Sequence, residues 1–405
     1  MAQRLDAGSA NRHRLELYSA GEQPLTFLAP EIRAALNNRL SRVSIGVPRM
    51  LVDALAERLR LTGFDDLSVW DLFLQNDMDQ LSGVVHREAL TLGNSYVTVW
   101  DKITVETAHQ MVTMEDPGTR ETVAGFKRWE TDKTTEGVLY LPNTIVRLRA
   151  NQTGATTQGF EVVDELENPL GVVPVVRFKN SDRLLGEGVS AMEPVLSLTD
   201  ALTKLTTDML TSSEYSARPR RWATGVELAE RDVLDDEGNP TGETEAVNPF
   251  GENDRMMISE AADSKFGQLQ GADLAAYQNA INVIMRQISA VSGLPEHMLG
   301  IGGDNPTSAD AMRSSESALT AKAEAKQSQF GRSWEQVARL AIAARDGVDP
   351  ASVSVSAQWA DPATRSVAQE ADAVVKLFSA GLLSQRFALK RLGYSDAEVR
   401  EIIAN

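Results

Sequence analysis

Side chains suited to chemistry are scarce in this sequence, and their spacing does not favour catalysis. The 405 residues include no cysteine, which excludes disulfides, thiolate metal sites and cysteine nucleophiles. None of the four histidines has a second histidine or a cysteine at ligand spacing, so we expect no transition-metal site. His86 lies in a helical pattern, and we expect it to be a surface or packing residue rather than a catalytic base.

Acidic pairs offer a second kind of chemistry. Asp77 and Asp79, or the acidic run at 235–237, could hold Mg²⁺ through carboxylates. Solvated acidic turns are favoured, because no second acidic pair has a spacing that would complete an octahedral site. A hydrolase built on Asp77 and Asp79 stays an alternative, although no nucleophile is paired with a base.

Two short motifs resemble those of phosphate or acyl chemistry but are incomplete. Gly300–Gly303 (GIGG) has no strand leading into it and no lysine after it, and the chain contains no P-loop signature. Ser190 lies in GVSAM, where Met192 replaces the second glycine of a hydrolase elbow. We interpret Ser190 as a helix cap, with Glu193 completing a capping box. The sequence predicts no enzyme activity and no cofactor.

The basic residues form two notable groups. Arg218, Arg220 and Arg221 lie beside Trp222 and could contact phosphate or an acidic partner, or their stems could pack over the indole. Lys322 and Lys326 are one helical turn apart and repel each other. They could face passing DNA, pair with acidic residues of a neighbouring subunit, or simply be solvated.

Two helical stretches of the chain have coiled-coil spacing. Their apolar residues recur at alternating steps of three and four, in a stripe too narrow for a globular core. The first stripe is Val195, Leu198, Leu202, Leu205 and Met209, and the second is Leu274, Tyr277, Ile281, Ile284, Ile288 and Val291. They enclose an acidic module, Arg218–Gln270, with six basic and twelve acidic residues. This layout is typical of a subunit of a larger assembly.

The rest of the chain predicts an α+β fold. Period-two runs between residues 96 and 179 predict a largely antiparallel sheet. Helices are expected before it at 30–60 and 69–92, whereas residues 1–25 are polar and are expected to form a loose arm. A long helix beginning at Ser308, a strand at Ser352–Trp359 and further helices from Asp361 are predicted to follow.

The net charge of −17 argues against a surface that wraps nucleic acid by neutralising phosphates. It does not exclude DNA passing nearby, because a negative wall would keep DNA from adhering. No apolar run is long enough to span a membrane, and the N-terminus has no signal-peptide core, so a cytosolic product is expected.

Four segments together resemble a known family. They are VSIGVPRMLVDALAERLRLTGF at 43–64, NPLGVVPVVRF at 168–178, the tract at 186–227 that begins GEGVSAMEPVL, and the tract at 275–341 that begins AAYQNAINVIM. In their order, the chain resembles the portal (head–tail connector) proteins of tailed bacteriophages, particularly siphophages that infect actinobacteria.

The resemblance implies a homo-oligomeric ring, usually of twelve subunits, at the unique capsid vertex of the virion. Double-stranded DNA would be pumped through its axial channel by the terminase large subunit, without sequence specificity, and would leave through it at infection. The implied partners are terminase, a head–tail adaptor, and the major capsid and scaffold proteins, with assembly in the host cytoplasm.

The resemblance also divides the chain. It implies an N-terminal arm (1–25), a wing (26–188), stem helices (189–217 and 271–293), a clip (218–270), a tunnel loop (294–308), a long wing helix and strand (309–361), and C-terminal helices forming a small crown (362–405). The implied channel residues are Ile301, Gly302, Gly303, Asp304 and Asn305, to which we add Lys322 and Lys326. Because the crown is short, the regulation of packaging attributed to large crowns is not expected.

A nucleic-acid-binding regulator is the alternative. The final helix pair, 384–404, could form a helix-turn-helix. It holds Arg386, Lys390, Arg391 and Arg400 against Asp396, Glu398 and Glu401, a net charge of only +1. Recognition helices usually lie in a far more basic setting.

Overall fold

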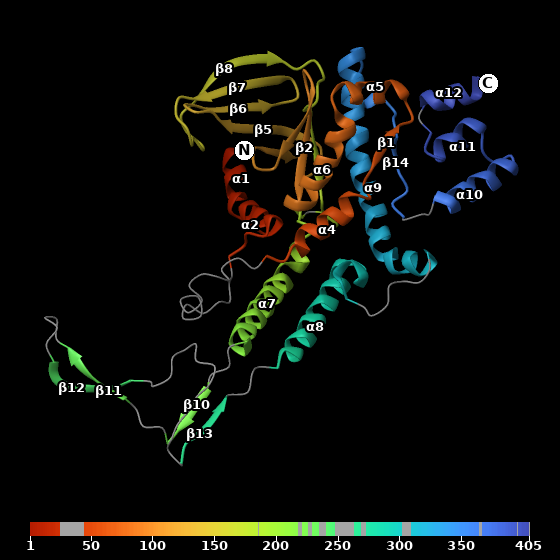
Figure 1. The fold of residues 1–405 in the computed structure, drawn as a ribbon. Helices are drawn as coiled ribbons and strands as arrows, with labels where there is room; N and C mark the ends of the chain where they lie inside the picture. The colour runs from red at the N-terminus through yellow and green to blue at the C-terminus, as the bar shows by residue number, and fades with distance from the viewer. Residues whose placement is uncertain are drawn as a thin grey trace. The chain divides into compact units, whose positions relative to one another are not determined.

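The computed structural model describes residues 1–24, 44–184, 186–217, 221–225, 229–234, 240–247, 263–268, 273–301, 309–363, 367–394 and 396–404 (Figure 1). The chain divides into two compact units. The first, here called the body, comprises Met1–Phe27, Ser44–Ala201 and Ile284–Asn405. The second, here called the stem–clip unit, comprises Leu28–Val43 and Leu202–Val283.

Two antiparallel sheets form the β part of the body. Strands β2 (Asn94–Val99), β3 (Ile103–Thr107) and β9 (Val175–Lys179) pair in the order β3-β2-β9. The five strands of the other sheet pair in chain order: β4 (Met111–Glu115), β5 (Thr122–Glu130), β6 (Thr135–Tyr140), β7 (Thr144–Ala150) and β8 (Phe160–Glu167) (Figure 1). The antiparallel pattern predicted from period-two runs is confirmed, and so is the α+β fold class.

The main core lies where helices cover the three-stranded sheet. Helices α4 (Val47–Ala56), α5 (Leu67–Gln75) and α6 (Met78–Leu92) pack there with the 38-residue helix α9 (Ala309–Asp346). Aromatic rings join these elements: Trp334 of α9 lies 4.7 Å from Phe178 of β9 and 5.6 Å from Phe73 of α5, measured between ring centroids. A small pair, β1 (Leu61–Phe64) with β14 (Ala357–Trp359), flanks this core.

The N-terminal residues are not a loose arm, and that prediction is wrong. They form α1 (Ala2–Ala7) and α2 (Ser9–Ala20), which contact β4, α4 and α6. Leu5 and Leu15 are buried, and Arg128 of β5 forms an ion pair with Asp6. A few widely spaced apolar residues suffice here because the sheet and α6 supply the rest of the buried surface.

The region predicted as helical at 69–92 consists of the helices α5 and α6. They meet at Asp77, whose backbone is left-handed (φ 57°). Helix α6 then ends at Gly93, also left-handed (φ 86°), where a Cβ atom would lie 2.5 Å from the carbonyl oxygen of Gly188. Close approach of the chain before α7 therefore requires glycine at this position.

The stem–clip unit contains most of α7 (Leu196–Ala217) and the first half of α8 (Leu274–Ser292). Between them are two antiparallel strand pairs, β10 (Arg221–Thr224) with β13 (Lys265–Gln268), and β11 (Ala229–Leu234) with β12 (Pro240–Val247). Of the two β-prone pieces that the sequence shows in this module, 221–226 contains β10, whereas 256–259 lies outside the described residues. Strands β11, β12 and β13 were not predicted.

The C-terminal region is helical, as predicted. It contains α10 (Val367–Ser379), α11 (Gln385–Arg391) and α12 (Asp396–Ala404). Among the residues with described placement, no helix has the length and apolar content that crossing a bilayer demands. The domain boundaries given above stay predictions.

Candidate functional site

The first predicted apolar stripe follows helix α7 and its entry turn. Val195 and Leu202 are buried, whereas Leu198, Leu205 and Met209 are half-buried. A second row on α7, which the sequence analysis missed, consists of the buried Thr199, Thr203 and Thr207. The hydroxyls of Thr199 and Thr207 each donate to the carbonyl oxygen four residues earlier, and those of Thr206 and Thr211 do the same. Such bonds let threonine hydroxyls be buried without unpaired donors.

Ser190 does not cap helix α7 directly. Its hydroxyl accepts from the backbone N–H of Met192, and a 3₁₀ turn, Glu193–Val195, precedes the α-helix. Glu193 instead accepts from Arg14 of α2 at 2.9 Å. The predicted capping box is therefore wrong, because the carboxylate has a long-range partner.

Helix α8 carries the second stripe, and much of its apolar surface remains exposed in the single chain. Asp273 lies before the first residue of the helix, and its carboxylate accepts from the N–H of Ala275 at 2.9 Å. Ile288 is buried, while Tyr277, Ile281 and Ile284 are half-buried, and Leu274 and Val291 are exposed. The most exposed large apolar residue of the helix, Val283 (54 %), lies beside the predicted stripe.

Lys322 and Lys326 both have partners within the chain. Lys322 donates from Nζ to the carbonyl oxygens of Val291 (3.2 Å) and Ser292 (2.7 Å), in the last turn of α8. Carbonyls at a helix C-terminus lack intrahelical donors, so this ammonium group satisfies them and complements the helix dipole. Burial lowers the pKa of Lys322, which the charge of Asp182 opposes. Lys326 forms an ion pair with Asp182 at 3.0 Å.

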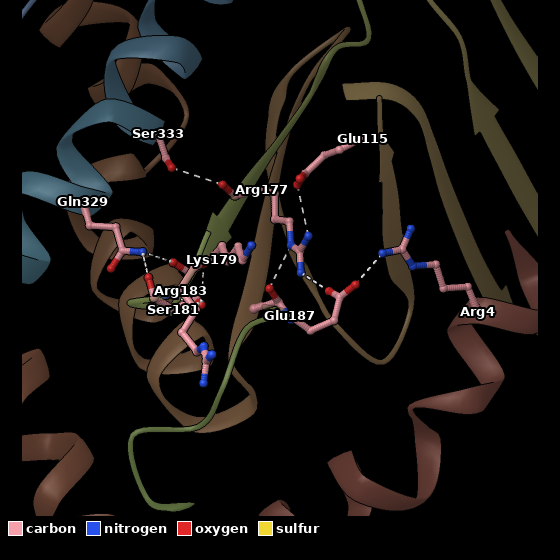
Figure 2. A network of polar contacts seen from close by, with 10 residues as sticks. Arg4, Glu115, Arg177, Lys179, Ser181, Arg183, Glu187, Gln329 and Ser333 are labelled. Carbon is pink, nitrogen blue, oxygen red and sulfur yellow. Dashed lines mark hydrogen bonds and ion pairs between the residues drawn. The ribbon is translucent and has the colours of Figure 1, made fainter. Parts of the chain in front are cut away.

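The same face of α9 continues as a polar stripe toward the sheet. Gln329 donates from Nε2 to the carbonyl oxygens of Lys179 (2.7 Å) and Ser181 (2.9 Å), and Ser333 donates to the carbonyl of Arg177 (Figure 2). Residues 322, 326, 329 and 333 recur at helical spacing, so one face of α9 holds the end of α8, strand β9 and the loop after it. Sequence reasoning found the two lysines but not their partners.

Arg177 is the centre of the network in Figure 2. Its guanidinium donates to Asn94 (2.8 Å), Glu115 (3.0 Å) and Glu187, and Glu187 also accepts from Arg4. Burial by itself lowers the pKa of Arg177, but the nearby Tyr96 and Glu187 reverse this, and the net pKa is raised. The network ties β9 to β2, to β4 and to the N-terminal helix α1.

The predicted tunnel-loop and clip residues are only partly described. Ile301 is buried, whereas Gly302, Gly303, Asp304 and Asn305 lie outside the described residues. Arg218 and Arg220 also lie outside them, and Arg221 is described only in its backbone, as the first residue of β10.

Among the four residues predicted for partner contacts, Trp222 is the one whose side chain the structure describes. Its ring lies over Gly267, the residue opposite it on β13, where an added Cβ would come within 2.5 Å of the indole. The indole is still 44 % exposed. It therefore has one face on the β10–β13 strand pair and another available to a partner.

The histidine and carboxylate candidates do not form a reaction centre in the described residues. His86 is fully buried, and its Nε2 accepts from Trp334 Nε1 at 2.8 Å. Burial lowers its pKa to about 3, so it is a neutral packing residue, as the sequence analysis allowed. No group of three or more potential metal ligands occurs in the part of the chain that the structure describes.

Comparison with known proteins identifies the family. A family model for phage portal proteins, SPP1 Gp6-like, matches residues 33–404. The chain belongs to this family of portal proteins. As such it is a component of the phage head, and the resemblance seen in the four sequence segments is confirmed.

Two portal proteins of mycobacteriophages are similar over most of their length. The chain is 31 % identical to the portal protein of Mycobacterium phage D29 over 391 residues, covering 88 % of this chain and 78 % of the relative. It is 31 % identical to that of Mycobacterium phage L5 over 389 residues, covering 88 % and 77 %.

Solved structures support the fold of this portal-family chain. A chain from the virion of the native gene transfer agent particle matches with a TM-score of 0.52 at 14 % identity, covering 95 % of this chain and 94 % of that one. A chain from the neck of the empty gene transfer agent particle, computed with C6 symmetry, matches with a TM-score of 0.50 at 14 % identity, covering 94 % and 98 %.

Proposed function

We propose that this portal-family chain assembles into a closed homo-oligomeric ring, of twelve subunits by family resemblance, at the unique vertex of the capsid. The observation that carries the proposal is the exposed apolar surface of α8: Leu274, Val283 and Val291 remain in solvent in a single chain. Neighbouring copies of the stem helices would bury these side chains, at about 25 cal/mol for each Å² of apolar surface covered. A head-to-tail contact of this kind closes into a ring when its rotation allows.

The ring would surround a channel for double-stranded DNA. Each chain contributes a net charge of −17, so a channel lined by several copies would repel phosphates and let DNA slide without sequence-specific binding. By resemblance, the tunnel loop at 294–308 would face the DNA. The internal contacts of Lys322 and Lys326 favour a role in holding α9 to its neighbours over direct contact with DNA.

The partners belong to the same proposal. The clip, with the half-exposed Trp222, would dock the terminase large subunit during packaging and the head–tail adaptor afterwards. Terminase would supply the ATP hydrolysis, so the portal itself needs no catalytic residues. Assembly with scaffold and major capsid proteins would take place in the host cytoplasm.

The ring is tested by measuring the mass of the purified protein by native mass spectrometry and imaging it in negative stain. We expect annular particles with a central hole. Val283→Asp should shift the population to monomers, because it places a charge in the subunit contact. Gln278→Asp adds the same charge at another exposed position of α8 and should leave rings intact. A wild-type protein that stays monomeric at every concentration refutes the proposal.

A further inference from the structure

Strand β8 is the uncovered edge of the five-stranded sheet (Figure 1). Seven of its eight residues are exposed, and among the described strands only β7 pairs with it. The opposite edge is different: β4 contacts α1, and Glu115 at its end accepts from Arg177. An edge strand presents a row of backbone N–H and C=O groups that can pair with another strand.

Strand β8 exposes apolar side chains in addition to the features that protect an edge strand from aggregation. A protected edge carries charges and a bulge. Strand β8 has both, with a register shift that places Val163 outside the ladder. However, it also exposes Val162 (57 %), Val163 (50 %) and Leu166, apolar surface that a purely protective edge would omit.

Charges alternate across the sheet and end at β8 on carboxylates. Glu136 of β6 lies opposite Arg149 of β7, to which it is joined at 2.7 Å, and Arg149 lies opposite Glu161 of β8. In the next row, Arg147 lies opposite Asp164. Opposite charges in facing positions stabilise neighbouring strands, so the next place in both rows suits a basic residue.

A second copy of β8 would fit this edge poorly. Glu161, Asp164, Glu165 and Glu167 give the strand four carboxylates. None of them forms an ion pair within the part of the chain that the structure describes. Two such edges would repel each other, and the whole chain is acidic.

We propose that β8 binds an extended basic segment of a different protein, which adds to the sheet as a sixth strand. Backbone hydrogen bonds to the free edge supply binding that is independent of sequence. Lysine or arginine opposite Glu161 and Asp164 supplies selectivity, and alternate apolar residues of the added strand cover Val162, which lies on the other face of the sheet.

The test uses the full-length protein and two fluorescein-labelled ten-residue peptides of equal composition. One alternates Lys or Arg with Val or Thr, and the other carries its basic residues in one block. Fluorescence anisotropy should show at least tenfold tighter binding of the alternating peptide. Amide hydrogen exchange should slow at β8 on binding, which a merely electrostatic attraction would not cause.

Charge reversal makes the test specific. Glu161→Lys with Asp164→Lys should weaken binding of the alternating basic peptide at least tenfold. Glu121→Lys with Asp132→Lys changes the net charge equally at exposed residues outside the strands and should have little effect. Equal loss in both variants, binding without protection of β8, absence of binding, or a change of oligomeric state in the β8 variant would each overturn the proposal.

Discussion

Helices α8 and α9 have apolar residues at similar helical spacing but bury them differently. On α9, Phe330, Trp334 and Val337 are fully buried, because the three-stranded sheet, α5 and β14 lie around that helix. On α8, only Ile288 among the apolar residues of the helix is fully buried, and Val283 and Val291 are about half exposed. The same type of pattern thus serves a core within the chain in one case and, as proposed, a core between chains in the other.

The polar residues of α9, like its apolar ones, find their partners within the chain. The polar face of α9 donates to carbonyls of α8, β9 and the following loop. Buried donors that find fixed acceptors stabilise one arrangement of the body. Substitutions in α9 and its neighbours should therefore act on the stability of the single chain, whereas those in α8 should act on assembly.

The largest effect is expected from Trp334→Ala. Removing a fully buried indole leaves a cavity and deprives His86 of its donor, which should lower the free energy of unfolding by about 3–5 kcal/mol. Chemical denaturation followed by circular dichroism measures this. Trp334→Phe keeps most of the volume and should cost less. A loss below about 1 kcal/mol for the alanine variant would contradict the view that α9, unlike α8, contributes its apolar residues to the core of the single chain.

Arg177→Met should have the next largest effect. It leaves Asn94, Glu115 and Glu187 without their shared donor, and we expect a loss of about 1–3 kcal/mol, because the two carboxylates can partly rehydrate. Arg332→Met, which removes an exposed ion pair with Glu335, is the control and should cost about 0–1 kcal/mol. Equal losses would mean that the network in Figure 2 contributes no more than a surface pair.

The buried His86 predicts a pH dependence. Its pKa in the folded protein is lowered to about 3, chiefly by burial, whereas the unfolded chain takes up a proton near its ordinary value of 6.5. Stability is therefore fully present above that value and falls as the pH drops, by about 1.4 kcal/mol per unit until the folded pKa is reached. Unfolding curves between pH 7 and pH 4 measure the slope. His86→Gln should flatten it, and an unchanged slope in that variant would assign the dependence to other groups.

A smaller effect on stability is expected from Lys322→Met. It removes two hydrogen bonds to the last turn of α8, for a loss of about 1 kcal/mol. Lys326→Met removes an ion pair whose partner Asp182 is exposed, and should cost less.

The two lysines also test their role toward DNA. The sequence predicts that Lys322→Glu with Lys326→Glu lowers the DNA content of particles while rings still form. The contacts of Lys322 predict instead that Lys322→Met already lowers stability without a DNA-specific defect. DNA per particle, measured alongside ring yield, separates the two outcomes.

Much of the architecture could be predicted because its signals are local. Period-two runs gave the strands β2 and β5–β9 but not β3 or β4, and the apolar spacing gave helix α8. The N-terminal helices were missed because Leu5 and Leu15 make a weak pattern whose burial depends on distant elements. The capping role of Ser190 failed for a similar reason: its neighbour Glu193 bonds to Arg14 far away in sequence.

By itself the sequence determined the fold class, the amphipathic helices α7 and α8, the acidic character and, through four segments, the portal family. These properties follow from residue type and short-range spacing. Both are local in the sequence and do not depend on which distant residues come together. Only the tertiary structure assigned Lys322 to the end of α8, His86 to the indole of Trp334, and the open edge of the sheet to β8. Each of these depends on which groups that are distant in sequence come within hydrogen-bonding distance, and local spacing does not encode that.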